Sequence, residues 1–110
     1  MKRTPLARSK PMRKVSAKRK AYRASDEGQA ARDHMAKVAK LNCLICNAWP
    51  VEVHHCYHGR YGTRKESDFD TIPLCRICHA DIHARKASWA LEHGPDYTHL
   101  TRVAKLLEGL

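Results

Sequence analysis

The chain has 110 residues, a formal net charge of +10 at pH 7, and a composition that is 43% hydrophobic but only 6% aromatic. This length supports one small domain with a thin core, and five cysteines, an odd number, argue against a disulfide framework and for metal binding in a reducing compartment. The sequence contains no signal-peptide pattern and no apolar run of membrane-spanning length, so we expect a cytoplasmic protein without membrane contact.

The excess positive charge lies at the N-terminus. The first 23 residues hold ten Lys or Arg and no acidic residue, whereas the rest of the chain holds eleven of each sign. We expect residues 1–24 to form a disordered basic arm and residues 25–110 to form the folded domain. Such an arm suits salt-dependent contact with nucleic-acid phosphates, although a solubilising tail is the alternative. The predicted nucleic-acid contacts in this arm are Lys18, Arg19 and Lys20.

A helix is predicted over residues 26–41. Ser25 is a suitable N-cap, and an apolar stripe repeats at helical spacing from Ala31 to Leu41. After a Cys-x2-Cys turn, "VEVHH" alternates like a short strand, and a glycine-bearing loop leads to "DTIPLC". We expect a second short strand there, interrupted by Pro73 because proline has no N–H to donate.

Three helical pieces are predicted to follow. The first lies in "HADIHARK", and the second lies in "SWALEH" with Ser88 as its N-cap and Gly94-Pro95 as its stop. The third runs from residue 98 to residue 107 and places its leucines on one face. Short strands followed by helices indicate an α+β fold.

The four cysteines in the two Cys-x2-Cys pairs carry the first metal prediction. Each pair can close a tight turn that presents two thiolates to one ion, as in tetrahedral zinc sites. The predicted structural zinc ligands are Cys43, Cys46, Cys75 and Cys78. The fifth cysteine, Cys56, is interpreted as an apolar residue of the hairpin.

The histidines suggest a second site. His79 and His83 are spaced i, i+4 and therefore project from one face of a helix. His54 and His55 are neighbours on a strand, where side chains alternate, so only one of them easily joins the helical pair. The other would remain an unbound imidazole near a metal, which is well suited to act as a general base.

With this pattern, the chain resembles the HNH, or ββα-metal, nucleases. "EVHH", a hairpin and "CHADIH" are similar to the metal motif of colicin-type DNases. The resemblance implies a small zinc-stabilised, treble-clef-like core with flanking helices. It assigns His55 as general base and Asp70 as a second catalytic residue, because the middle Asn of the family pattern, which ties the hairpin loop, falls on Asp70. We expect a backbone carbonyl near Asp70 to orient the base. The implied ligands of the catalytic ion are His54, His79 and His83.

A closer likeness extends through "HGRYGTRKESDFDTIPLCRICHADIH" into "WALEHG", roughly residues 43–95. This stretch is similar to the phage recombination enhancement function (Ref) nucleases. Those enzymes contain zinc and a basic N-terminal arm, and they act on DNA with a RecA-type recombinase filament. The resemblance therefore implies a DNA endonuclease in the cytoplasm of a bacterial host, with that filament as a partner. We expect the protein to be a monomer.

The predicted activity is metal-dependent hydrolysis of DNA phosphodiester bonds. Imidazole ligands favour Zn, Mn or Ni as the catalytic ion, and Mg is the weaker-binding alternative. The loop between the strands adds cations that can hold flanking phosphates, namely Arg60, Arg64 and Lys65. The alternative function is a non-catalytic zinc-knuckle module that binds nucleic acid.

Overall fold

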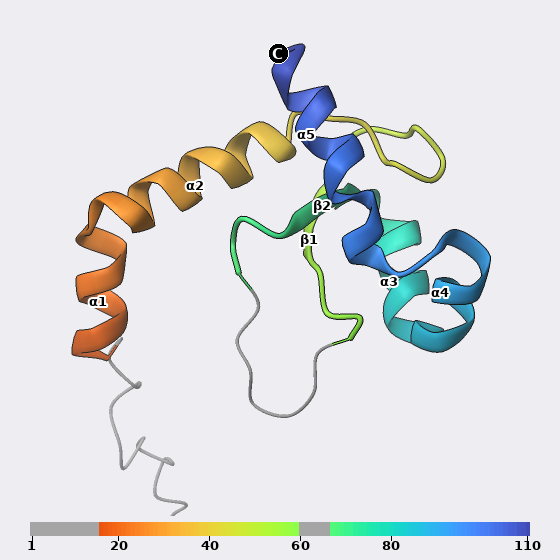
Figure 1. The fold of residues 1–110 in the computed structure, drawn as a ribbon, viewed down its shortest axis with the longest axis horizontal. Helices are drawn as coiled ribbons and strands as arrows, with labels where there is room; N and C mark the ends of the chain where they lie inside the picture. The colour runs from red at the N-terminus through yellow and green to blue at the C-terminus, as the bar shows by residue number, and fades with distance from the viewer. Residues whose placement is uncertain (1–15, 60–66) are drawn as a thin grey trace, which may run out of the picture.

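A computed structural model describes residues 16–59 and 67–110 of the chain. Figure 1 shows helices arranged around one strand pair, which confirms the predicted α+β class. No helix in these two ranges is long and apolar enough to cross a membrane. In chain order the elements are α1 (Ala17–Ala24), α2 (Asp26–Val38), β1 (Glu52–His55), β2 (Thr71–Leu74), α3 (Arg76–Ala84), α4 (Lys86–His93), the 3-10 helix η1 (Asp96–His99) and α5 (Leu100–Glu108).

The N-terminal segment differs from its prediction. Part of the expected disordered arm, Ala17–Ala24, forms helix α1, while residues 1–15 lie outside the described ranges. Ser16 caps α1, and Ser25 both ends it and caps α2 by accepting the Gly28 N–H at 3.1 Å. The predicted cap of the long helix is thus confirmed. A single capping residue between two helices creates a corner in which α1 folds back from the axis of α2 (Figure 1).

The two strands pair antiparallel, with His54 opposite Ile72 and His55 opposite Thr71. The sequence predicted that Pro73 would interrupt the second strand, but β2 continues through it. Its carbonyl accepts the Leu44 N–H at 3.2 Å, on the side away from β1. Because the N and C=O of a strand residue point to the same side, the missing proline N–H also faces away from β1, and the ladder loses no hydrogen bond.

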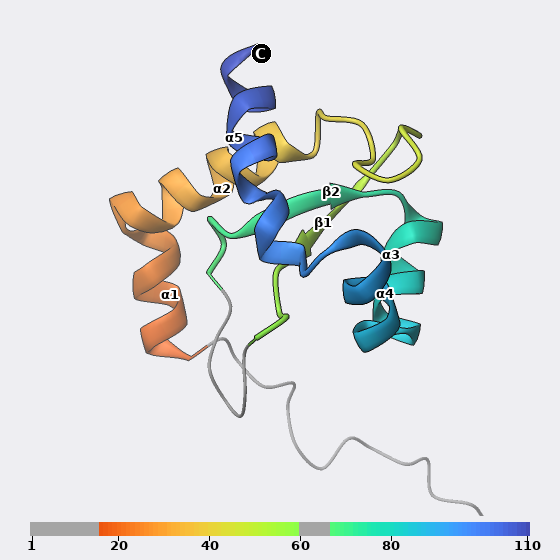
Figure 2. The same ribbon diagram turned by 45° about the vertical axis from the view of Figure 1, so that its right-hand side comes forward.

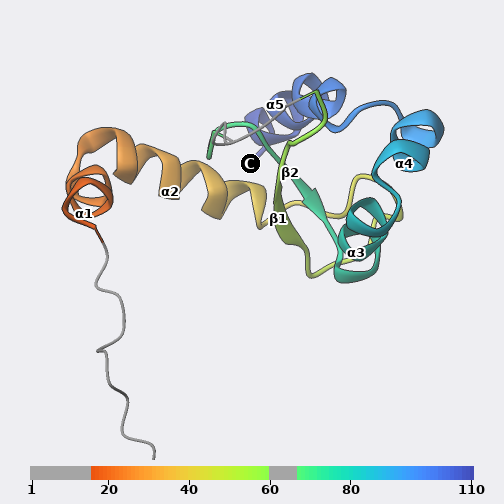
Figure 3. The same ribbon diagram turned by 90° about the horizontal axis from the view of Figure 1, so that it is seen from below.

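The remaining helices pack around this strand pair. Figure 2 shows α5 crossing beside α2 and β2, and Figure 3 places α1 and α3 on opposite sides of the strands. The fully buried Trp89 of α4 belongs to the core, whereas Trp49 is 66% exposed. The α4 helix begins one residue after Arg85, so Ser88 lies inside it and is not its cap. Gly94 ends this helix with φ of 82°, as the sequence suggested.

Candidate metal centres

The cysteine cluster, defined as Cys43, Cys46, Cys75 and Cys78, lies where two tight turns meet. The first turn follows α2, and the Asn47 N–H closes it on the Cys43 carbonyl at 2.9 Å. The second turn begins α3, where the Cys75 sulfur caps the helix by accepting the Cys78 N–H. All four sulfurs lie within 4.8 Å of one another, and those of Cys46 and Cys75 are 3.4 Å apart. Four thiols at this separation could hold a zinc ion.

The turns affect the protonation of the four thiols unequally. Burial alone raises the pKa of Cys43, but backbone N–H groups of Cys46, Cys75 and Ile45 outweigh it and lower the pKa to about 7. Burial, together with hydrogen bonds to the neighbouring sulfurs, raises the pKa of Cys78. The turns therefore favour one thiolate, and an ion that binds all four sulfurs must displace protons. Cys56 is 2% exposed within the core and does not join the cluster.

The histidine cluster, defined as His54, His79 and His83, is separate from the sulfurs. One ring nitrogen from each residue lies within 4.8 Å of the other two. The Nε2 atoms of His79 and His83 are 3.1 Å apart, and the His54 ring lies edge-on to both of these rings. The i, i+4 pair on α3 and the inward-facing residue of β1 therefore converge on one point.

In two members of this cluster, the ring nitrogen that faces away from the other histidines contacts a carboxylate. His54 Nε2 lies 2.9 Å from Asp96 Oδ2, and His79 Nδ1 lies 3.0 Å from Glu52 Oε1. An ionised carboxylate only accepts, so each of these nitrogens carries the proton and donates. His54 Nδ1 is then a buried lone pair, and it has no hydrogen-bond partner among the described residues. Carboxylate–histidine pairs that leave the other nitrogen bare are typical of metal ligands, so these residues fit a divalent ion.

Asp96 is the most enclosed carboxylate of the site. Besides His54 it accepts the N–H groups of Tyr57 at 2.8 Å and His58 at 3.2 Å. Burial by itself raises the pKa of Asp96, but the hydrogen bonds outweigh burial and the pKa lies below its ordinary value. His58 donates from Nε2 to the Lys86 carbonyl and accepts the Asp96 N–H at Nδ1, so both of its nitrogens are used in holding η1 against the loop after β1.

His55 lies on the other side of β1 from His54, as strand alternation requires. Its Nε2 atom is 2.8 Å from Asp68 Oδ1, whose second oxygen is 3.5 Å from the hydroxyl of Tyr22 on α1. We expected a backbone carbonyl near Asp70 to orient this ring. The Asp70 carbonyl instead accepts the Cys56 N–H at 2.9 Å, and a carboxylate takes the predicted role. The catalytic assignment of Asp70 stays a prediction.

The predicted nucleic-acid contacts fall into two groups. Lys18, Arg19 and Lys20 are exposed on α1, a helix that contains no acidic residue. The three cations of the inter-strand loop lie outside the described residues, namely Arg60, Arg64 and Lys65. Of the two groups, only the α1 cations can be placed, and Tyr22 of the same helix reaches the Asp68 carboxylate.

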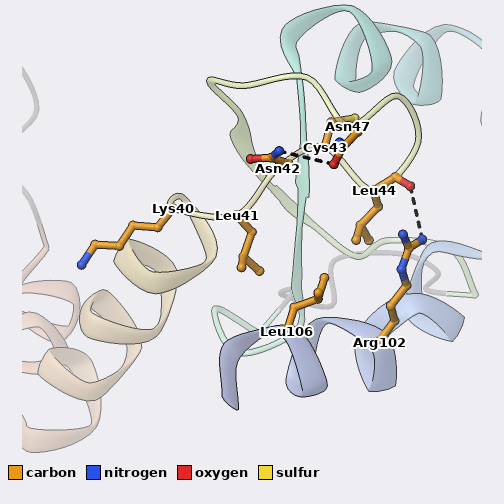
Figure 4. A pocket seen from close by; sticks show the side chains of 8 residues that line it. All are labelled: Lys40, Leu41, Asn42, Cys43, Leu44, Asn47, Arg102 and Leu106. Carbon is orange, nitrogen blue, oxygen red and sulfur yellow. Dashed lines mark hydrogen bonds between the residues drawn. The ribbon is translucent and has the colours of Figure 1, made fainter. Parts of the chain in front are cut away.

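A shallow pocket beside the first cysteine turn contains no histidine (Figure 4). Within it Arg102 donates to the Leu44 carbonyl at 3.2 Å, and Asn42 donates to the Asn47 side-chain oxygen at 3.3 Å. The arginine of α5 therefore supports the turn that carries Cys43. The residues that line the pocket are Lys40, Leu41, Asn42, Cys43, Leu44, Asn47, Arg102 and Leu106.

Sequence reasoning missed two carboxylates, Asp68 and Asp96. Asp96 lies 42 residues after His54 and Asp68 lies 13 residues after His55, and neither falls in a ligand-like spacing. Glu52, the acidic residue just before the histidine pair, carries no prediction of its own. No local signal pointed to either residue, because seven of the eleven acidic residues follow β1 and spacing does not single out any of them.

Comparison with known protein families finds a match over most of the chain. The model of a family described as "Protein of unknown function (DUF968)" matches residues 18–107, which include α2, both strands and both clusters. No curated protein and no solved structure matches the chain.

Proposed function

We propose that this chain, which belongs to the DUF968 family of proteins of unknown function, is a metal-dependent HNH-type endonuclease that hydrolyses DNA phosphodiester bonds. One observation carries the proposal. Three imidazoles from a strand and the following helix converge, and the buried Nδ1 of His54 has no partner among the described residues. A protein that only needs a stable core gains nothing from an unsatisfied buried nitrogen, because its desolvation is unfavourable.

The donor set indicates the kind of ion. Three neutral imidazoles suit Zn, Mn or Ni, and Mg would bind more weakly. Three protein ligands also leave coordination positions for other groups, unlike the four-thiol cluster, which is closed. When bound, such an ion would supply Lewis-acid stabilisation of the charge on the scissile phosphate.

In the proposed reaction, His55 acts as the general base. The oxygen of a water molecule forms a bond to phosphorus while His55 takes the proton of that water at Nδ1. The bond from phosphorus to the 3′-oxygen breaks, and this leaving oxygen takes a proton from solvent. Because Nε2 of His55 faces the Asp68 carboxylate at 2.8 Å, the proton of the neutral ring resides there and Nδ1 carries the lone pair.

The other parts of the chain have supporting roles in this proposal. The cysteine cluster holds zinc and fixes the start of α3, which carries two of the histidines. Lys18, Arg19 and Lys20 contact DNA phosphates through charge alone, so they confer no base specificity. In line with the Ref-like stretch, the proposed enzyme acts as a monomer in a bacterial cytoplasm, with a RecA-type filament presenting the DNA.

The test is cleavage of supercoiled plasmid with each of the four ions, with and without a recombinase filament. Replacing His55 with Ala should keep the fold and DNA binding while lowering the cleavage rate by about 10²–10⁴-fold, the usual contribution of a general base. His93→Ala is the matched control, because His93 ends α4 and its ring packs on Trp89. Cleavage by the His55 variant at the wild-type rate would exclude this base. A wild-type protein that binds DNA but never cleaves it would favour the zinc-knuckle binding module.

A further inference from the structure

We propose that Asp68 is a positioning residue for His55, which fixes the imidazole as the Nε2–H tautomer and so directs Nδ1 toward the water molecule. The expected effect on the cleavage rate rests on the proposed function, whereas the effect of Asp68 on the tautomer of His55 does not. Asp68 has no role in the sequence motif, since the corresponding family position falls on Asp70.

The contact itself is close and partly shielded. The Nε2 and Oδ1 atoms are 2.8 Å apart, and the two side chains are 34% and 31% exposed. An ion pair of this exposure adds little to stability because water screens it. A hydrogen bond at that distance nevertheless selects which nitrogen of the ring holds the proton and which way the ring faces.

The backbone around Asp68 holds its carboxylate in place. The turn before β2 is closed by the Asp70 N–H, which donates to the Ser67 carbonyl at 3.1 Å, and the Thr71 hydroxyl donates to the Asp68 carbonyl at 3.3 Å. Thr71 is also the strand partner of His55. The register of the hairpin therefore sets the position of the carboxylate relative to the ring, so the contact is not a chance meeting of two surface side chains.

Among the described residues, three carboxylate–histidine hydrogen bonds lie around these strands. Asp96 contacts Nε2 of His54, Glu52 contacts Nδ1 of His79, and Asp68 contacts Nε2 of His55. In the first two pairs, the carboxylate determines which ring nitrogen of a candidate metal ligand is unprotonated. We infer the same effect in the third pair, on the one histidine of the three that is not in the cluster.

The experiment measures tautomer and rate separately. Protein labelled with ¹⁵N-histidine and loaded with zinc is examined by long-range ¹H–¹⁵N NMR at mildly alkaline pH, where neutral imidazole dominates. Wild-type His55 should be protonated at Nε2. Asp68→Ala should lose this preference, and Asp33→Asn, which changes an exposed carboxylate on α2 that contacts Gln29, should not.

Cleavage kinetics give the second readout. Asp68→Ala should lower kcat by at least about tenfold, short of the full loss expected without the base, about 10²–10⁴-fold. KM and DNA affinity should not change, and Asp68→Glu should restore part of kcat. An Nδ1–H ring in the wild-type protein, or an unchanged tautomer and kcat in Asp68→Ala, would overturn the inference. Absence of cleavage with every ion would instead overturn the proposed function, and the NMR result alone would then decide whether Asp68 sets the tautomer.

Discussion

The cysteine cluster and the histidine cluster each include two residues from α3 or its N-cap, but the two clusters are supported differently. Cys75 and Cys78 open α3, and His79 and His83 follow in its next turns. The sulfurs are held by two local turns and by backbone N–H groups within them. Two of the three imidazoles contact side-chain carboxylates. His79 contacts Glu52 of β1, and His54 contacts Asp96 of η1, which lies far along the chain.

This difference predicts how each cluster would respond to the loss of a metal ion. A site held by backbone turns and closed by four thiols is coupled to folding, since binding an ion organises the turns themselves. A site whose ligand nitrogens are set by separate side chains can be tuned without unfolding the protein. The two clusters should therefore respond differently when their ligands or supports are removed.

The largest effect is expected from the cysteine cluster. Replacing Cys43 and Cys75 with Ser removes one sulfur from each turn and should abolish the folded state. Structural zinc contributes about 10–16 kcal/mol in small zinc domains, and a domain of this size has a total stability of about 5–15 kcal/mol. Circular dichroism and zinc content by mass spectrometry provide the measurement. A folded, zinc-free double variant would show that the sulfur site is not the scaffold.

The second effect concerns a histidine ligand on the same helix. His79→Ala should keep the fold, with a change in the free energy of unfolding below about 1 kcal/mol, as for most partly exposed sites. It should nevertheless lose the second metal equivalent while retaining the first. Native mass spectrometry gives the stoichiometry, and thermal unfolding gives the stability. If His79→Ala unfolded as the double cysteine variant does, the proposed separation of scaffold and reactive site would fail.

The elements most readable from sequence were those with local causes. Ser25 caps a helix because its own side chain reaches the Gly28 N–H. The cysteine turns and the i, i+4 histidines are likewise set within a few residues. The continuity of β2 through Pro73 could not be predicted from the sequence. A strand accepts proline where its N faces away from the partner strand, and here that side faces Leu44, a contact made only in the tertiary structure. The carboxylate partners of His54 and His55, Asp96 and Asp68, could not be predicted either, because the tertiary structure brings each pair together.

Helix α1 was missed for a related cause. Its high content of Lys and Arg resembles that of disordered segments, yet its residues are good helix formers, and its end is fixed by the corner with α2. A side chain at Gly28 would collide with the backbone of Tyr22, so this corner requires a glycine within the first turn of α2. Composition predicted the charge of the segment but not its conformation.

The third effect tests the buried support. Asp96→Asn replaces one of two acceptor oxygens by an amide NH2 group. Because His54 and Tyr57 share Oδ2 and the His58 N–H donates to Oδ1, the asparagine cannot accept from all three. Affinity of the histidine cluster for zinc should fall by about 10–100-fold, the usual range for losing a carboxylate behind a ligand. Competitive titration with a chelating dye measures this. Zinc retained by the cysteine cluster is the internal control for folding, and unchanged affinity at the second site would show that Asp96 serves only the loop.

The smallest effect is expected from the exposed support. Glu52 is 53% exposed, so water and salt screen its contact with His79 far more than they screen the fully buried Asp96. Glu52→Gln should lower zinc affinity at the histidine cluster by less than about tenfold, below the range for a well-held carboxylate partner, and the loss should shrink further as salt is raised. The same dye titration at low and high salt measures it. A loss as large as that of Asp96→Asn, and independent of salt, would mean that burial does not decide how strongly these carboxylates hold their histidines, because the two contacts differ by only 0.1 Å in length.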